Sequence, residues 1–144
     1  MTNDLIKAND NQPEIVKQTV NQTYCSFTPK SMKERKELFN ALENCDVKLN
    51  DIVGQKVKVK NLFIQEYPRT DKVTGEPISN GHRTIIFDET GKTYVTASNY
   101  FFVSISKLIN AIGTPDTWEE PIEIEIVKRA VGSSSNQCLS FKLV

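Results

Sequence analysis

The chain has 144 residues, which is the usual size of one domain. Its 18 basic and 18 acidic side chains cancel, a balance that speaks against a strongly basic polyanion binder. No apolar run approaches the roughly 18 residues of a membrane span, and the start, MTNDLIKANDNQPE, lacks the pattern of a secretory signal. We therefore expect a cytoplasmic protein. Three widely spaced cysteines predict neither a disulfide framework nor a zinc site: Cys25, Cys45 and Cys138.

The N-terminal residues 1–22 are rich in Asn, Gln, Thr and Asp. Such a segment buries little apolar surface, so we predict a flexible arm. The remaining residues, 23–144, then form a single domain. At its start the more apolar segment Tyr24–Phe27 can add an edge strand before Pro29.

A helix is predicted over residues 31–44. Ser31 and Glu34 have the spacing of a capping box, in which each side chain accepts a hydrogen bond from the other residue's backbone N–H. Apolar residues then follow on one side of this helix: Leu38, Phe39 and Leu42. The polar remainder indicates that the helix lies on the surface of the domain.

From Gln55 the apolar period changes from helix to strand. Lysine and valine alternate strictly over Lys56–Lys60, and the apolar phase then shifts at Leu62, which predicts a bulge near Lys60–Asn61. Two prolines and two glycines predict a long loop over 67–82. We expect the second strand at His82–Asp88, a turn at Glu89–Lys92 and the third strand at Thr93–Ser98.

A second helix follows the third strand. Ser98 or Asn99 can cap its start, and Gly113 with Pro115 marks its end. One continuous apolar stripe runs along it: Phe101, Ile105, Leu108, Ile109 and Ile112. Beyond it, a fourth strand begins after Pro121, a short loop occupies 132–136 and a fifth strand covers Gln137–Val144.

The resulting order is strand, long loop, strand, turn, strand, helix, strand, loop, strand. This mainly β order predicts a five-stranded OB-fold barrel with one helix between the third and fourth strands, preceded by the N-terminal helix and the flexible arm. An α+β sandwich with the same order of elements is the alternative fold.

Signatures of enzymes are absent from the sequence. His82 is the only histidine, and its place at a loop–strand junction indicates a solvated loop residue. No Ser/His/Asp set and no glycine-rich phosphate loop can be assembled. We therefore expect a non-catalytic protein with no metal site and no cofactor.

A binding surface is better supported, because OB-folds bind nucleic acid across their second and third strands. Residues 55–107 hold eight Lys or Arg and five Asp or Glu, a net charge of +3. If Thr90-Gly91 is the tip of the hairpin, Phe87 lies opposite Tyr94, and Arg83 shares their outward face. Aromatic side chains stack on bases and cations contact phosphates.

The candidate contacts with single-stranded DNA fall into three groups. Two aromatics on the sheet are expected to stack on bases: Phe87 and Tyr94. Three basic side chains on the sheet are expected to contact phosphates: Lys58, Lys60 and Arg83. The two flanking loops contribute the rest: Tyr67, Arg69, Lys72, Lys128 and Arg129.

Two structural alternatives compete with these assignments. A slip of the hairpin by one residue exchanges the two faces of the sheet, and Phe87 and Tyr94 then become a core pair. The row Lys56, Lys58 and Lys60 is also what a plain solvent-exposed face, or an edge protected against strand pairing, looks like.

Four segments carry a resemblance to a known family: Tyr24–Phe27, Glu37–Ala41, Asn50–Val59 and Gly113–Ile122. In their order and spacing they resemble single-stranded DNA-binding proteins of small bacteriophages and mobile elements of Gram-positive bacteria. The resemblance spans roughly residues 24–144 and implies an OB-fold that coats single-stranded DNA during replication. It transfers no site residues. The end, Phe141–Val144, differs from cellular proteins of this activity in lacking an acidic tail, so the resemblance does not extend to the recruitment of host repair enzymes by that route.

The leading hypothesis is therefore a non-catalytic single-stranded DNA-binding protein that acts in phage or plasmid replication in the host cytoplasm. Replication proteins are further candidate partners, and the pattern leaves a monomer and a homodimer open. The alternative is a protein–protein adaptor with an OB-fold in a replisome or in phage assembly, which zero net charge and the acidic fourth strand favour.

Overall fold

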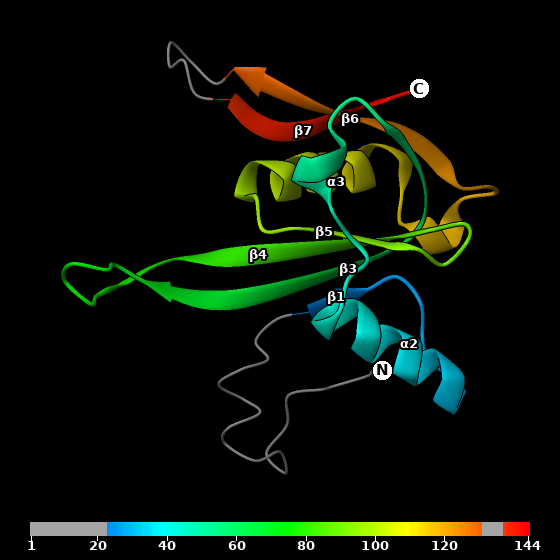
Figure 1. Cartoon of the computed structure of the whole chain (residues 1–144), viewed down its shortest axis with the longest axis horizontal. Coiled ribbons are helices and arrows are strands. Elements are labelled where there is room, and N and C mark those ends of the chain that lie inside the picture. Colours follow the sequence, from blue (N-terminus) through cyan, green and yellow to red (C-terminus); the bar gives the residue numbers. More distant parts are fainter. Residues whose placement is uncertain (1–22, 131–136) are drawn as a thin grey trace.

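The computed structural model describes residues 23–130 and 137–144. It is mainly β, with a curled mixed sheet and two helices (Figure 1). The predicted N-terminal arm, 1–22, and the predicted loop, 132–136, lie outside the described residues. In chain order the elements are β1 (Thr23–Cys25), α2 (Met32–Glu43), β2 (Val47–Lys48), the 3-10 turn η1 (Leu49–Ile52), β3 (Lys56–Thr70), β4 (Pro77–Asp88), β5 (Thr93–Thr96), α3 (Asn99–Ile112), η2 (Pro115–Thr117), β6 (Ile122–Ala130) and β7 (Gln137–Leu143).

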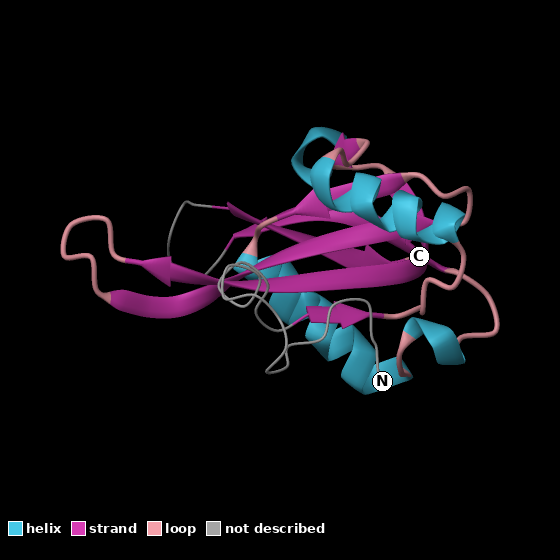
Figure 2. Cartoon of the chain, turned by 90° about the horizontal axis from the view of Figure 1, so that it is seen from below, coloured by secondary structure: helices cyan, strands magenta, loops and turns pink. Residues whose placement is uncertain are grey.

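The sheet has the order β2-β5-β4-β3-β6-β7, with β1 as a further partner of β3. Strands β2 and β5 pair in parallel, and the other pairs are antiparallel. Within the described ranges β2 and β7 are the two ends of the sheet and do not pair with each other. The curled sheet is therefore a half-barrel rather than a closed barrel (Figure 2). In the described part of the chain seven strands form, where five barrel strands and one edge strand were expected: β1 is the predicted edge strand, whereas β2 was not predicted. This arrangement is consistent with an OB-like fold.

Strand β3 is bent and serves two parts of the sheet. Its first residues, 56–59, pair with β6, and residues 59–70 pair with β4. The register shifts between Val59 and Asn61, which confirms the predicted bulge. Ser26 stabilises the bend, because its hydroxyl contacts Asn61 Oδ1 and accepts a hydrogen bond from the Leu62 N–H, both at 2.9 Å.

Two hydrophobic clusters lie on opposite faces of β3, β4 and β5. The inner cluster fills the half-barrel and includes Leu62, Ile86 and, from α3, the predicted stripe residues Phe101, Ile105 and Leu108. The outer cluster lies beneath α2 and comprises Leu38, Ala41, Phe63, Ile85 and Phe87. Because α2 covers the outer face, this part of the sheet is buried on both sides.

Helix α2 begins with the predicted capping box at Ser31 and Glu34. The predicted common side of Leu38, Phe39 and Leu42 is wrong for Phe39, because this side chain is 59% exposed whereas Leu38 is buried. Successive residues of a helix are about 100° apart, so a helix that turns Leu38 and Ala41 toward the sheet points Phe39 toward solvent.

The long loop predicted over 67–82 is also wrong, because most of it is a β-hairpin that extends beyond the half-barrel (Figure 1). Only residues 71–76 connect the strands. Pro68 lies at a second register shift, between Tyr67 and Arg69, where the ladder is already interrupted. Gly75 adopts a φ of 74° in the turn, and the Asp71 carboxylate accepts hydrogen bonds from the N–H groups of Val73 and Thr74.

The register of the β4–β5 hairpin differs by one residue from the expected one. Phe87 pairs with Thr93, and Ile86 pairs with Tyr94. The Asp88 carboxylate determines this turn, because it accepts hydrogen bonds from the Thr90 and Lys92 N–H groups and from the Tyr94 hydroxyl. Instead of a two-residue tip at Thr90-Gly91, the four residues Glu89–Lys92 connect β4 with β5.

Neither helix in the described ranges has the length and apolarity that a membrane crossing requires.

Candidate nucleic-acid interface

The outer face of the sheet continues past α2 onto the β3–β4 hairpin. There Gln65 pairs with Arg83 and Tyr67 pairs with Gly81. Side chains of cross-strand partners share a face, so these residues follow directly from the covered pair Phe63 and Ile85. We call this partly exposed continuation the hairpin face and define it by Gln65, Tyr67, Arg69 and Arg83.

Tyr67 lies across the neighbouring strand because its partner has no side chain. A Cβ atom at position 81 would collide with Cε2 and Cζ of the Tyr67 ring. The tyrosine is half-buried against β4 and keeps part of its surface toward solvent. A ring held against a strand in this way is preorganised to stack on a base.

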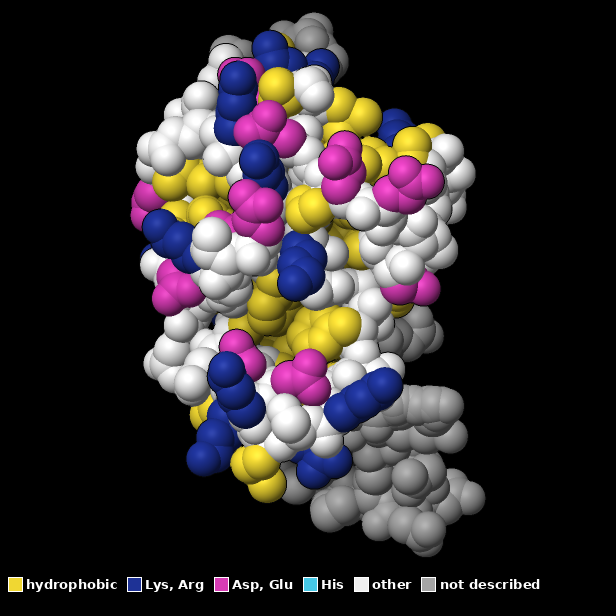
Figure 3. All heavy atoms as spheres, turned by 90° about the vertical axis from the view of Figure 1, so that its right-hand side faces the viewer, with side chains coloured by type: hydrophobic (Ala, Val, Ile, Leu, Met, Phe, Trp, Pro, Cys, Tyr) yellow, Lys and Arg dark blue, Asp and Glu magenta, His cyan; other side chains and the backbone are white. Residues whose placement is uncertain are grey.

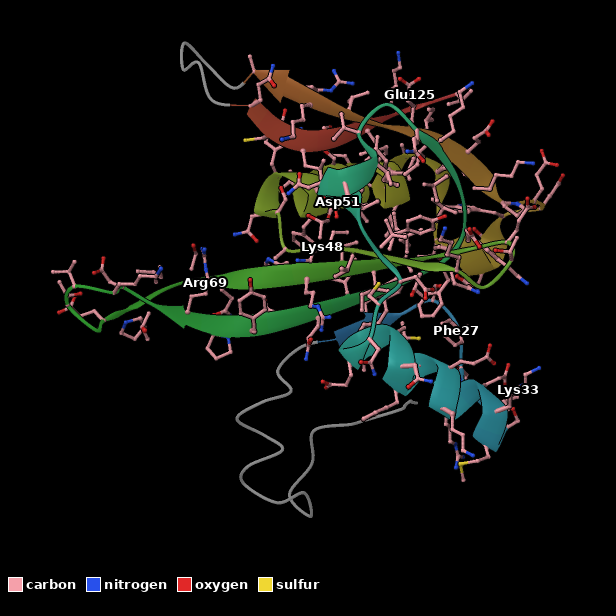
Figure 4. All side chains as sticks on the ribbon, in the orientation of Figure 1. Phe27, Lys33, Lys48, Asp51, Arg69 and Glu125 are labelled. Atoms are coloured by element: carbon pink, nitrogen blue, oxygen red, sulfur yellow. The ribbon has the colours of Figure 1, made fainter. Side chains whose placement is uncertain are left out.

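Two arginines flank this ring along the hairpin. Arg69, labelled in Figure 4, donates hydrogen bonds from Nε to the Ser79 carbonyl at 2.9 Å and from Nη2 to the Ser79 hydroxyl at 3.2 Å. Arg83 pairs with Gln65, two residues along the strand from the Tyr67–Gly81 pair and nearer to the half-barrel. Among the described residues neither arginine has an acidic partner within ion-pair distance. Both positive charges therefore remain available to an anion.

The opposite face of the hairpin is anchored to α3. The His82 ring stacks on Phe102 with centroids 3.7 Å apart, and its Nε2 lies 3.1 Å from Glu66 Oε2. The His82 N–H donates to the Asn99 side-chain oxygen at 3.1 Å. The expectation of a solvated loop histidine is wrong, because this side chain is only 18% exposed. These contacts fix the direction of the hairpin and keep Glu66 away from the hairpin face.

The two aromatics expected to stack on DNA are buried instead. Phe87 is 9% exposed and contacts Phe27 edge to face at 5.3 Å, beneath α2. Tyr94 is 8% exposed in the inner cluster, and its hydroxyl donates to Asp88 Oδ2 at 3.0 Å. The one-residue change of register puts the two rings on opposite faces, and both faces are covered. Their predicted exposure and their pairing are therefore corrected.

Ionisation of Tyr94 and Asp88 reflects this environment. Burial, followed by the hydrogen bond to Asp88, raises the pKa of Tyr94 to about 12. Partial burial of Asp88 opposes its ionisation, but the hydrogen bonds from Thr90, Tyr94 and Lys92 outweigh it, so the pKa of Asp88 is lowered. The pair is a structural element of the β4–β5 turn.

The lysine row on the first half of β3 faces glutamates. Lys56 and Lys58 pair in register with Glu125 and Glu123 of β6, and Lys58 Nζ lies 3.6 Å from Glu89 Oε1. Figure 3 shows basic and acidic side chains alternating down this side of the molecule. Lys60 is exposed but lies beside Glu119 and Glu120 in a hollow. This arrangement agrees with the alternative of a solvent-exposed face.

The remaining candidates lie at the ends of two projections. Lys72 is exposed in the turn of the β3–β4 hairpin. Lys128 and Arg129 are exposed near the end of β6, where they pair with Leu139 and Cys138 of β7. The hairpin and the end of β6 point to the same side of the molecule in Figure 1. Of the ten predicted residues, the structure thus gathers Tyr67, Arg69 and Arg83 on one surface.

Two features of this surface were missed in the sequence. Gly81 was interpreted as a loop glycine, although it lies opposite Tyr67 and leaves the space that the Tyr67 ring occupies on the hairpin face. The covering of Phe87 by α2 was also missed, and the one signal for it was Leu38 and Ala41, three residues apart on one helix face.

Comparison with protein families gives one match. Residues 14–144 match the model of the phi29-type family described as Phage Single-stranded DNA-binding protein. No curated protein and no solved structure matches the chain significantly. The match covers most of the chain, including every described element, and agrees with the resemblance found in the sequence. The chain belongs to the phage single-stranded DNA-binding protein family.

Proposed function

We propose that this protein binds single-stranded DNA through the hairpin face, with Tyr67 stacked on a base and Arg69 and Arg83 on the flanking phosphates. Membership of a phage single-stranded DNA-binding family supports the DNA-binding role. The observation that supports this surface is the half-buried Tyr67 ring, held over Gly81 between two arginines that have no acidic partner among the described residues.

In this proposal the fold is an OB barrel whose five strands are β3 to β7, with α3 between the third and the fourth. In an OB-fold the loop between the first two strands and the loop between the last two flank the ligand. The β3–β4 hairpin has the first of these positions. Lys72 in its turn, and Lys128 and Arg129 near the end of β6, then extend the phosphate contacts at the two edges.

The physiological role that follows is non-catalytic coating of single strands during replication of phage or plasmid DNA in the host cytoplasm. Stacking on aromatics accepts every base, because each base has a π-face. In this arrangement the two arginines contact phosphates and the tyrosine contacts the face of a base, so no side chain contacts the hydrogen-bonding edge of a base. We therefore expect binding without strong sequence preference. Zero net charge is compatible with this role, because the contacts depend on the local charge of one face.

A titration of fluorescent oligo(dT) at two salt concentrations, compared with a duplex of equal length, tests the proposal. Binding to single strands releases counterions from each contacted phosphate, so affinity should fall as salt rises. We expect the single strand to bind at least about tenfold more tightly than the duplex, because one stacked base contributes about 1–3 kcal/mol. Equal or tighter binding of the duplex would contradict the proposal.

A further inference from the structure

The β3–β4 hairpin extends from the half-barrel with little support beyond its base (Figure 1). The pairing of β1 with β3 stops at Thr23 and Gln65, and past this point β3 pairs with β4 alone among the described residues. Residues 72–79, around the turn of the hairpin, are all exposed. A two-stranded ribbon by itself is only marginally stable in water. The direction of the hairpin therefore depends on contacts at its base.

The start of α3 provides such contacts on the back of the hairpin. The ring of His82 lies parallel to the ring of Phe102, with an interplanar angle of 2° and centroids 3.7 Å apart. The His82 N–H donates to Asn99 Oδ1 at 3.1 Å. Phe102 itself packs against the inner cluster, and the Ser98 hydroxyl caps this end of α3. Strand β4 is therefore held to a fixed helix end by one ring and by one backbone hydrogen bond.

The two nitrogens of the His82 ring have different surroundings. Nδ1 is buried and has no hydrogen-bond partner among the described residues, whereas Nε2 lies 3.1 Å from Glu66 Oε2. Because a carboxylate can only accept a hydrogen bond, we assign the ring proton to Nε2, which then donates it to Glu66. Glu66 is the cross-strand partner of His82 in β3. The same ring thus connects α3, β4 and β3.

His82 also lies directly behind the hairpin face. Its two neighbours in β4 are Gly81 and Arg83, the cross-strand partners of Tyr67 and Gln65. Side chains alternate along a strand, so His82 points to α3 while its two neighbours belong to the opposite face. Because the three residues are consecutive, a displacement of His82 also displaces the glycine under the tyrosine ring and the arginine next to it.

We propose that His82 is a positioning residue for DNA binding: stacked on Phe102, it holds the hairpin in the direction in which Tyr67 and Arg83 reach the same single strand. The inference rests on the proposed function, because it concerns the same surface. His82 contacts no DNA in this arrangement. It acts by ordering the hairpin before the strand arrives, so that binding does not have to meet this entropic cost.

A positioning role differs measurably from a purely structural one. A structural role changes the free energy of unfolding and leaves the affinity of the folded protein for DNA unchanged. Under a positioning role the hairpin of the folded variant adopts other directions, and affinity falls in proportion to the fraction of molecules that remain competent. If that fraction drops to about one fifth, binding weakens about fivefold.

The experiment combines fluorescence anisotropy titrations of oligo(dT) of about 10 nucleotides, near the site size of one OB fold, with urea unfolding of the same proteins. The variants are His82→Ala, Phe102→Ala, the double variant and the conservative His82→Phe. The matched control is Ile109→Ala, two turns further along α3, whose side chain also packs against the inner cluster. If His82→Ala does not fold, His82→Gln replaces it, since glutamine keeps a donor for Glu66 but has no ring.

We expect His82→Ala and Phe102→Ala each to weaken binding about fivefold, and the double variant to lose no more than either single one, because both remove the same stack. His82→Phe keeps a ring on Phe102 and should stay within about twofold of the wild type. Ile109→Ala should lose stability and keep its affinity.

Four results would overturn the inference and leave the proposed function intact. The first is wild-type affinity of His82→Ala while Tyr67→Ala binds weakly. The second is an equal loss of affinity in Ile109→Ala, which would indicate general destabilisation. The third is additive losses in the double variant, and the fourth is a His82→Phe variant as weak as the alanine variant, because each excludes the stack as the cause. Absence of binding by the wild type would overturn the proposed function and this inference together.

Discussion

The two halves of β3 place positive side chains on neighbouring surfaces with opposite consequences. In the half-barrel, Lys56 and Lys58 pair in register with glutamates of β6. In the hairpin, the partners of Gln65 and Tyr67 are Arg83 and Gly81. The same strand alternation therefore produces a neutralised surface at one end and a positive aromatic surface at the other. The neighbouring strand, rather than the basic residues themselves, decides which half is available to a phosphate.

The same contrast separates the aromatic residues. Phe87 and Tyr94 have neighbours on both faces of the sheet, since α2 and the inner cluster cover them. Tyr67 has a glycine opposite it and lies beyond the part of the sheet that α2 covers. Four predictions can break or sharpen the comparison.

The largest effect is expected for Phe87→Ala, on stability. Removing a buried phenylalanine costs about 3–5 kcal/mol, and this ring fills the outer cluster beneath α2. Urea unfolding measures the loss, and Phe87→Leu provides a milder variant if the alanine variant does not fold. DNA affinity of the folded protein should be unchanged. A loss of DNA affinity with little loss of stability would mean that Phe87 contacts DNA, as the sequence had predicted.

The effects expected of Tyr67→Ala are the reverse of those of Phe87→Ala, because DNA binding should weaken while the fold stays stable. Loss of one stacked base costs about 1–3 kcal/mol of binding, or roughly tenfold in affinity for short oligo(dT), measured by fluorescence anisotropy. Stability should change little, since the ring is half-exposed. The matched control is Tyr100→Ala, which removes a 38% exposed ring on α3 outside the hairpin face. Equal effects of the two substitutions would remove the special role of Tyr67.

The two classes of basic residue should differ in the salt dependence of binding. Arg83→Ala should reduce the slope of log affinity against log salt by about 0.7, the value for one phosphate contact on a single strand. Lys58→Ala should leave the slope unchanged, because Glu89 already pairs with Lys58. Titrations over several salt concentrations measure both slopes. If Lys58→Ala gives the larger reduction, the DNA follows the first half of β3.

The smallest effect is the pH dependence of Tyr94→Phe. The pKa of Tyr94 is raised to about 12 in the folded protein, whereas an unfolded chain ionises tyrosine near pH 10. Below about pH 10 the wild type has the full benefit of the neutral hydroxyl, and it loses this benefit as the pH rises toward 12. The variant should be about 1 kcal/mol less stable at pH 7, and the gap should narrow between pH 10 and 12. Chemical unfolding at several pH values measures it, and a constant gap would contradict the assignment.

Local signals in the sequence predicted many of the elements. The capping box at Ser31 and Glu34, the bulge near Asn61 and the apolar stripe of α3 are properties of a few neighbouring residues, and all three are present. The β3–β4 hairpin was missed because Pro68 and Gly81 are loop residues by composition, although here they lie at a register shift and beneath a ring. Composition does not reveal which strand a residue faces.

The candidate site depended on non-local information and was predicted less well. A change of one residue in register, determined by hydrogen bonds to the Asp88 side chain, moved Phe87 and Tyr94 to opposite faces. The position of α2 on the outer face then covered Phe87. Tyr67, Arg69 and Arg83 were named in the sequence, but their common surface follows from the pairing of β3 with β4.

Photochemical crosslinking tests the central claim most directly. Short single strands that contain bromodeoxyuridine are bound to the full chain, irradiated, and the modified peptide is identified by mass spectrometry. The account predicts that the crosslink lies at Tyr67 on the β3–β4 hairpin and disappears in Tyr67→Ala. Crosslinks confined to the Lys56–Lys60 row or to α2, with an unmodified hairpin, would contradict it.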